Sequence, residues 1–139
     1  MKLKVVRIVT ASYVVPWHLN NTLLRMPIDF EVCVVGQDVS KYRDAYPDVL
    51  FFDIDIDRKK TFFSDFVALL ALCRFFIIYK PDIAHSIMPK SGLLAALSGF
   101  CCRVPIRIHT FTGQTWAARI GFSRYFYYLI DRLINFLNT

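Results

Sequence analysis

Two histidines, His85 and His109, stand near the ends of short apolar segments that have the composition of β-strands. An imidazole titrates near neutral pH, so it can exchange a proton or hydrogen-bond a reacting group. Thr110, Thr112 and Gly113 follow His109, and a glycine there lets a ligand approach the backbone. Open α/β sheets bind ligands at the carboxyl ends of their strands. We therefore predict His109 as a catalytic residue beside His85; the alternative is that His109 only satisfies a buried hydrogen bond.

Three further residues are candidates for contacting a ligand. Lys90 stands at the start of a predicted helix, where a positive charge beside the helix amino terminus suits a phosphate or pyrophosphate. The alternative is a solvated lysine in an exposed loop. Trp17 and His18 follow the first predicted strand and could line an acceptor pocket, because an aromatic face stacks well on a sugar ring. The alternative for Trp17 is packing at the entry of a helix.

Several sequence signatures are missing. The segment 10–18 after the first predicted strand lacks the G-x-G-x-x-G pattern that lets backbone amides reach a pyrophosphate, and the chain holds no G-K-[ST] motif. This argues against a nicotinamide or flavin enzyme. The cysteines, at 33, 73, 101 and 102, form no C-x-x-C pair, so we expect reduced thiols, no zinc site and no cofactor.

The elements that must position these residues alternate between strand and helix along the whole chain. Strands are predicted over 5–9, 30–35, 49–54, 83–86 and 106–110. Helices are predicted over 18–26, 62–79 (capped by Thr61 or Ser64), 91–102 and 122–138, with a possible short helix around Tyr42 and Arg43. Repeated β-α units with β-branched strands predict one α/β domain over 1–139, a Rossmann-like, doubly wound, mostly parallel sheet.

Composition and charge indicate which kinds of partner the protein surface binds. The 139 residues are 55% hydrophobic and 16% aromatic, with a net charge of +6. This suggests apolar surface for a membrane, a partner chain or a missing domain, and favours anionic partners. No basic stripe or reading module favours nucleic acid. The longest apolar run, 66–79, is shorter than the roughly 20 residues of a membrane-spanning helix.

The last predicted helix carries a second surface signal. Its apolar residues recur at helical spacing, so we expect most of that stripe to be core. These residues are Phe122, Phe126, Leu129, Ile130, Leu133, Phe136 and Leu137. Tyrosines at 125, 127 and 128 lie among arginines at 119, 124 and 132, a pattern similar to that of a membrane-surface helix. The alternative is an ordinary amphipathic helix that covers the sheet.

Two segments carry a resemblance to a known family. KPDIAHSIMPKSGLLAA (80–96) and VPIRIHTFTG (104–113) resemble family 4 glycosyltransferases of bacterial surface-polysaccharide pathways. The likeness extends to the closing DRLINFLNT and is looser over the first sixty residues. It implies a retaining enzyme of GT-B architecture, in which two Rossmann-like domains enclose the active site. Residues 1–139 would be the amino-terminal, acceptor-side half, and the carboxyl-terminal donor domain would be absent.

The resemblance also implies roles for particular residues. His109 is implied to reach the donor sugar, and His85, Lys90, Thr112 and Gly113 to line the same edge. Many family members have a Gly-Gly turn after the first strand, whereas this chain has Tyr-Val-Val-Pro at 13–16. Without these glycines, the loop after the first strand is not expected to contact a diphosphate as it does in those family members.

We therefore expect half of a hexosyltransferase-type enzyme that is inactive alone. It would transfer a sugar from a nucleotide-sugar, without a metal, to a lipid-linked or polysaccharide acceptor. The donor would be held by the missing domain or a partner chain. The domain would be cytoplasmic and bound peripherally to the anionic inner face of the cell membrane. One alternative is a non-catalytic, acceptor-binding or membrane-recruiting subunit of a split glycosyltransferase. Another is a flavodoxin-like domain that binds a phosphorylated ligand.

Overall fold

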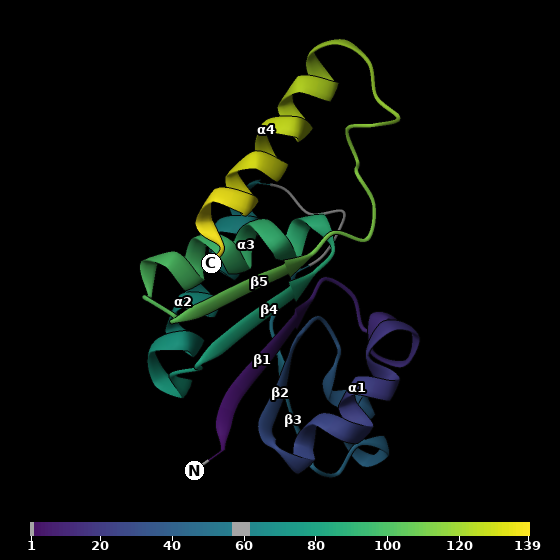
Figure 1. The fold of residues 1–139 in the computed structure, drawn as a ribbon, viewed down its shortest axis with the longest axis vertical. Helices are drawn as coiled ribbons and strands as arrows, with labels where there is room; N and C mark the ends of the chain where they lie inside the picture. The colour runs from purple at the N-terminus through teal and green to yellow at the C-terminus, as the bar shows by residue number, and fades with distance from the viewer. Residues whose placement is uncertain (1, 57–61) are drawn as a thin grey trace.

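A computed structural model describes residues 2–56 and 62–139 and shows a five-stranded parallel sheet between layers of helices (Figure 1). The strands are β1 (Leu3–Val9), β2 (Phe30–Gly36), β3 (Val49–Asp53), β4 (Ile83–Ile87) and β5 (Ile106–Thr110). Their spatial order is β3-β2-β1-β4-β5, and every neighbouring pair is parallel. The chain builds outward from β1 to β3, then returns and builds outward again through β4 and β5. This confirms the predicted doubly wound α/β fold.

The strand order also distinguishes a Rossmann-like sheet from a flavodoxin-like one. The order 3-2-1-4-5 is that of the Rossmann fold, whereas a flavodoxin-like sheet has the order 2-1-3-4-5. The strand order therefore rules out the flavodoxin-like alternative. The topological switch point, where ligands bind in such sheets, lies between β1 and β4.

The helices lie on both faces of the sheet. One face carries a π-helical turn, η1 (Val15–Leu19), then α1 (Asn20–Arg25) and two 3₁₀ helices, η2 (Met26–Ile28) and η3 (Ser40–Ala45). The other face carries α2 (Phe62–Tyr79) and α3 (Pro89–Cys101), and α4 (Gly121–Leu137) packs on α3 (Figure 1). Strand and long-helix bounds lie within two residues of those predicted. The suggested Thr61 cap of α2 lies outside the described residues.

The single helix predicted over 18–26 is wrong, because the structure has three short pieces there. Pro16 stands in the first turn of η1 and Pro27 in the first turn of η2. Proline has no backbone N–H and clashes with the preceding turn, so an α-helix cannot run through Pro27. The short helix suggested around Tyr42 is present as η3.

The core is divided by the sheet into two apolar clusters. Alternate residues of a strand project to opposite faces, so Val9 and Val34 pack toward α1 while Val6 and Ile8 pack toward α2 and α3. Residues 5–9 are all buried, which explains the nearly continuous β-branched run in the sequence.

The last helix, α4, differs from its prediction. Ile134 and Leu137 are buried and Ile130 packs partly against α3, whereas Phe122 is 83% exposed and Phe136 79%. Only the carboxyl-terminal turns of α4 reach α3, and its first half extends beyond the body of the domain (Figure 1). The expectation that most of the stripe is core was therefore wrong.

The described residues contain neither a membrane-spanning helix nor a group of metal ligands. Within 2–56 and 62–139, no helix has both the length and the apolarity needed to cross a bilayer. In the same part of the chain, no three side chains among His, Cys, Asp and Glu are grouped as metal ligands. The four cysteines form no disulfide among the described residues.

Candidate functional site

His109 lies in β5 with its ring held on three sides. Nδ1 is 2.9 Å from Ser86 Oγ of the neighbouring strand, and the Phe111 ring meets the imidazole edge-on at 4.4 Å. On the third side is Gly92, in the first turns of α3, where an added Cβ would lie 2.4 Å from His109 Cε1. The ring therefore fits only because position 92 has no side chain.

The electrostatic state of His109 follows from this enclosure. Burial lowers the pKa of His109, although a hydrogen bond with Ser86 opposes the shift. The imidazole is consequently neutral at pH 7. Its Nε2 is buried without a hydrogen-bond partner among the described residues. A buried polar atom without a partner costs free energy, so Nε2 is the unsatisfied nitrogen of this ring.

His85 does not share this environment. Its Nε2 is 2.8 Å from Thr110 Oγ1, and it stands opposite Arg7 in the β1–β4 register. Burial, with a smaller contribution from the Arg7 charge, lowers the pKa of His85 to about 4.

The expectation that His85 and His109 line one edge together needs correction. In the β4–β5 register, His85 pairs with Ile108 and Ser86 pairs with His109. Residues that pair across strands project to the same face, and their sequence neighbours project to the opposite face. His109 therefore faces α3, while His85 and Thr110 face the side on which α1 lies. The two imidazoles are on adjacent strands but are separated by the sheet.

Lys90 has a partner inside the domain. Its Nζ is 2.7 Å from Asp65 Oδ1, which lies in the first turn of α2. The start of α3 is also tied to the end of β1, because Ser91 N donates to Thr10 Oγ1 at 3.3 Å. Lys90 thus lies in the first turn of a helix, as predicted. The Asp65 carboxylate partly neutralises its positive charge, which was expected to bind a phosphate.

The remaining predicted residues lie on the surface. Trp17 is 72% exposed, and its ring centroid is 4.3 Å from that of His18 and 6.4 Å from that of Tyr13. Packing at a helix entry does not describe Trp17, which instead forms an exposed aromatic cluster. Thr112 and Gly113 are exposed in the β5–α4 loop, with open space around Gly113.

Sequence reasoning missed Arg7, a buried charged residue in the middle of β1. Arg7 is 7% exposed, its Nη1 reaches the Met26 sulfur at 3.7 Å, and its Nε has no partner among the described residues. Burial lowers the pKa of Arg7 to about 10. A lone arginine inside an apolar, β-branched run is the sequence signal that could have identified it.

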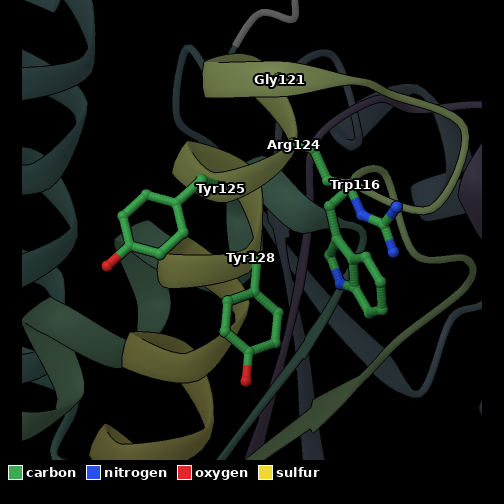
Figure 2. Close-up of a pocket in the computed structure, with 5 residues that line it drawn as sticks. All are labelled: Trp116, Gly121, Arg124, Tyr125 and Tyr128. Atoms are coloured by element: carbon green, nitrogen blue, oxygen red, sulfur yellow. The ribbon is translucent and has the colours of Figure 1, made fainter.

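Trp116, in the β5–α4 loop, was also missed. It lines a shallow pocket of about 260 Å³ with Gly121, Arg124, Tyr125 and Tyr128 of α4 (Figure 2). Arginine and aromatic side chains pair along this part of the chain. Arg119 lies 4.1 Å from the Tyr127 ring centroid and Arg124 5.6 Å from that of Trp116. The sequence signal is a large aromatic residue inside an otherwise small and polar loop.

No protein-family model matches the chain. It is similar to the capsular polysaccharide biosynthesis glycosyltransferase CapM of Staphylococcus aureus, with 30% identity over 136 residues. The match covers 98% of this chain and 36% of that protein, so the chain spans about a third of its relative.

Two solved structures share the fold. A Listeria monocytogenes protein described as a UDP-N-acetylglucosamine 2-epimerase superposes with a TM-score of 0.70 and 20% identity, covering 99% of this chain and 37% of that one. A second UDP-N-acetylglucosamine 2-epimerase gives a TM-score of 0.65 with 19% identity, covering 99% and 40%. At these identities the likeness concerns the fold, and the sheet matches the Rossmann-like half domains of GT-B proteins.

Proposed function

We propose that this chain is the acceptor-side, Rossmann-like domain of a glycosyltransferase of surface-polysaccharide biosynthesis. The observation that carries the proposal is the likeness to a capsular polysaccharide glycosyltransferase along 136 residues, together with the Rossmann strand order. In this proposal residues 1–139 are the amino-terminal half of a family 4, retaining, metal-independent enzyme. A carboxyl-terminal domain, in the same protein or in a partner chain, holds the nucleotide-sugar.

His109 has the central role in the proposed reaction. Ser86, Gly92 and Phe111 fix its ring, and Nε2 is the ring nitrogen that has no hydrogen-bond partner among the described residues. A preorganised polar group that hydrogen-bonds the donor sugar stabilises the charge that develops as the bond from the sugar to the diphosphate breaks. His109 acts by this contact and forms no covalent bond with the sugar. The acceptor oxygen then bonds to the sugar carbon, its proton passes to the departing phosphate oxygen, and the nucleotide leaves as its diphosphate.

The proposal includes contact with a membrane, because the acceptor is lipid-linked. The first half of α4 exposes large apolar side chains such as Phe122 and Phe126, and the exposed Arg119 lies just before it. Apolar and basic side chains together are the combination that binds the surface of an anionic bilayer. We place the protein at the cytoplasmic face of the cell membrane for this reason.

The test is transfer of a labelled sugar. The chain alone is expected to transfer no sugar and to bind uridine and guanosine diphosphate sugars weakly, because it has no glycine-rich phosphate cradle and Lys90 is paired with Asp65. Mixing the chain with a carboxyl-terminal donor domain should produce labelled lipid-linked saccharide. Submicromolar binding of a nucleotide-sugar by the chain alone, measured by calorimetry, would contradict the assignment to the acceptor side.

A further inference from the structure

Two hollows lie side by side between the β5–α4 loop and α4. The first, of about 260 Å³, is the pocket lined by Trp116, Gly121, Arg124, Tyr125 and Tyr128 (Figure 2). The second, of about 230 Å³, is lined by Phe111, Gln114, Trp116, Tyr128, Asp131, Arg132 and Asn135. Both are lined by Trp116 and Tyr128, whose rings meet edge-on at 5.5 Å. We call the two hollows together the Trp116 groove.

The chemistry of the groove changes along its length. The first hollow is formed by aromatic rings and one guanidinium, as Figure 2 shows for Trp116, Tyr128 and Arg124. The second adds planar polar groups: the amides of Gln114 and Asn135, the carboxylate of Asp131 and the guanidinium of Arg132.

This combination matches a saccharide. A sugar ring has an apolar C–H face, which packs on an aromatic ring, and neighbouring hydroxyls that both donate and accept hydrogen bonds. Planar amides, carboxylates and guanidinium groups can meet two such hydroxyls at once. A lipid chain would offer these polar groups no hydrogen bonds.

Contacts within the domain hold the walls of the groove in place. The Trp116 and Tyr128 rings meet edge-on at 5.5 Å, and Arg124 lies 5.6 Å from the Trp116 ring centroid. Arg132 Nη1 donates to Tyr128 Oη at 3.2 Å. A ligand therefore meets rings that are already ordered, which reduces the entropy cost of binding.

The groove also leads toward the proposed reaction centre. Phe111 lines the second hollow, and its ring meets the His109 imidazole edge-on at 4.4 Å. We propose that the Trp116 groove binds two adjacent sugar units of a saccharide, with the second unit at Phe111. The inference rests on the proposed function in one respect: it takes this saccharide to be the acceptor.

The experiment uses the two tryptophans of the chain, Trp17 and Trp116, as reporters. Protein labelled with 5-fluorotryptophan gives two fluorine NMR signals, which the variants Trp17→Phe and Trp116→Phe assign. Titration uses disaccharides built from glucose, galactose, their N-acetylamino forms and their uronic acids. The Trp116 signal should shift saturably with at least one disaccharide, while the Trp17 signal stays in place.

Substitutions then locate the site. Gln114 and Asn135 are exposed, so the double variant Gln114→Ala/Asn135→Ala should keep the fold and weaken binding at least tenfold. Phe136→Ala, on the same helix but outside both hollows, is the matched control and should bind as the parent does. Circular dichroism checks that each variant is folded.

Several results would overturn the inference. These are no shift of Trp116 with any disaccharide, a shift that the double variant leaves unchanged, or a shift with anionic vesicles alone, which would make the groove a lipid-contact surface. A shift confined to Trp17 would place the saccharide at η1 instead and leave the glycosyltransferase proposal intact. Conversely, saccharide binding at Trp116 without sugar transfer by the two-domain enzyme would support the groove and contradict the proposed function.

Discussion

Gly92 and His109 fit together because Gly92 has no side chain. A Cβ at position 92 would lie 2.4 Å from Cε1 and 2.7 Å from Nδ1 of His109. Gly92 is in α3 and His109 in β5, so this contact sets how closely the helix approaches the edge strand. It also fixes the imidazole that we propose as the catalytic group.

The effect of Gly92→Ala on the free energy of unfolding should therefore depend on the residue at position 109, destabilising the parent and stabilising a variant without the imidazole. In the parent protein it should destabilise the fold by on the order of 1–3 kcal/mol, because an overpacked contact must be relieved by strain. In a His109→Ala background the same substitution should stabilise by about 0.5–1 kcal/mol, since alanine is a better helix former than glycine. Urea unfolding of the four proteins measures both values. An equal effect in both backgrounds would show that the two residues are not coupled.

Stability should fall as the pH falls from about 6.5 toward 4. Burial and the Arg7 charge lower the pKa of His85 to about 4, and burial lowers that of His109. The unfolded chain titrates its histidines near 6.5, so in this window it binds protons that the native state does not. The urea midpoint should be lower at pH 5 than at pH 7.5, and His85→Gln should reduce the difference. A midpoint independent of pH over that range would contradict the buried, neutral histidines.

Replacing Arg7 by methionine should stabilise the fold. Arg7 is 7% exposed, and its Nε has no partner among the described residues. Removing a poorly paired buried charge should therefore gain on the order of 1–3 kcal/mol. Arg74→Met is the matched control, because Arg74 is exposed on α2 and should change stability by less than about 0.5 kcal/mol. Thermal unfolding tests the pair, and a large loss of stability in Arg7→Met would mean that Arg7 has a stabilising partner.

Binding to vesicles tests the membrane contact. The chain should bind vesicles that contain anionic lipid and dissociate as salt is raised, because exposed charges are screened within roughly 8–10 Å. Changing Arg119, which lies outside both hollows of the Trp116 groove, to glutamine should weaken binding about fivefold, since a basic residue near an anionic surface contributes about 1 kcal/mol. Changing Arg25 and Arg43, which are exposed on the opposite side of the sheet, should have a smaller effect. Equal binding to neutral vesicles at high salt would show that apolar contact alone is responsible.

The fold was largely predictable because each of its signals is local. The β-branched runs at 5–9 and 30–35 and the break at 80–82 mark where strands and helices begin and end, and alternation of the two implies a parallel sheet. The pieces around Pro16 and Pro27 were predicted less well. There the choice among α, π and 3₁₀ turns depends on packing against the sheet.

The candidate site was less predictable because it depends on register and on distant contacts. His85 and His109 look equivalent in sequence, and only the pairing of Ser86 with His109 shows that they face opposite sides. The Lys90–Asp65 pair joins two helices, and no local pattern indicates it. Trp116 lines a pocket only because α4 folds back beside the β5–α4 loop and brings Tyr128 against the indole ring.

Turnover of the two-domain enzyme with a changed His109 tests the central claim most directly. With a carboxyl-terminal donor domain added, the parent chain should transfer labelled sugar from its nucleotide-sugar to a lipid-linked acceptor. His109→Ala should reduce kcat by on the order of a hundredfold or more, as loss of one preorganised polar contact does. His85→Ala, on the opposite face of the sheet, should have a much smaller effect. Near-normal turnover of a folded His109→Ala enzyme would contradict the account and reduce His109 to a packing residue between Ser86 and Gly92.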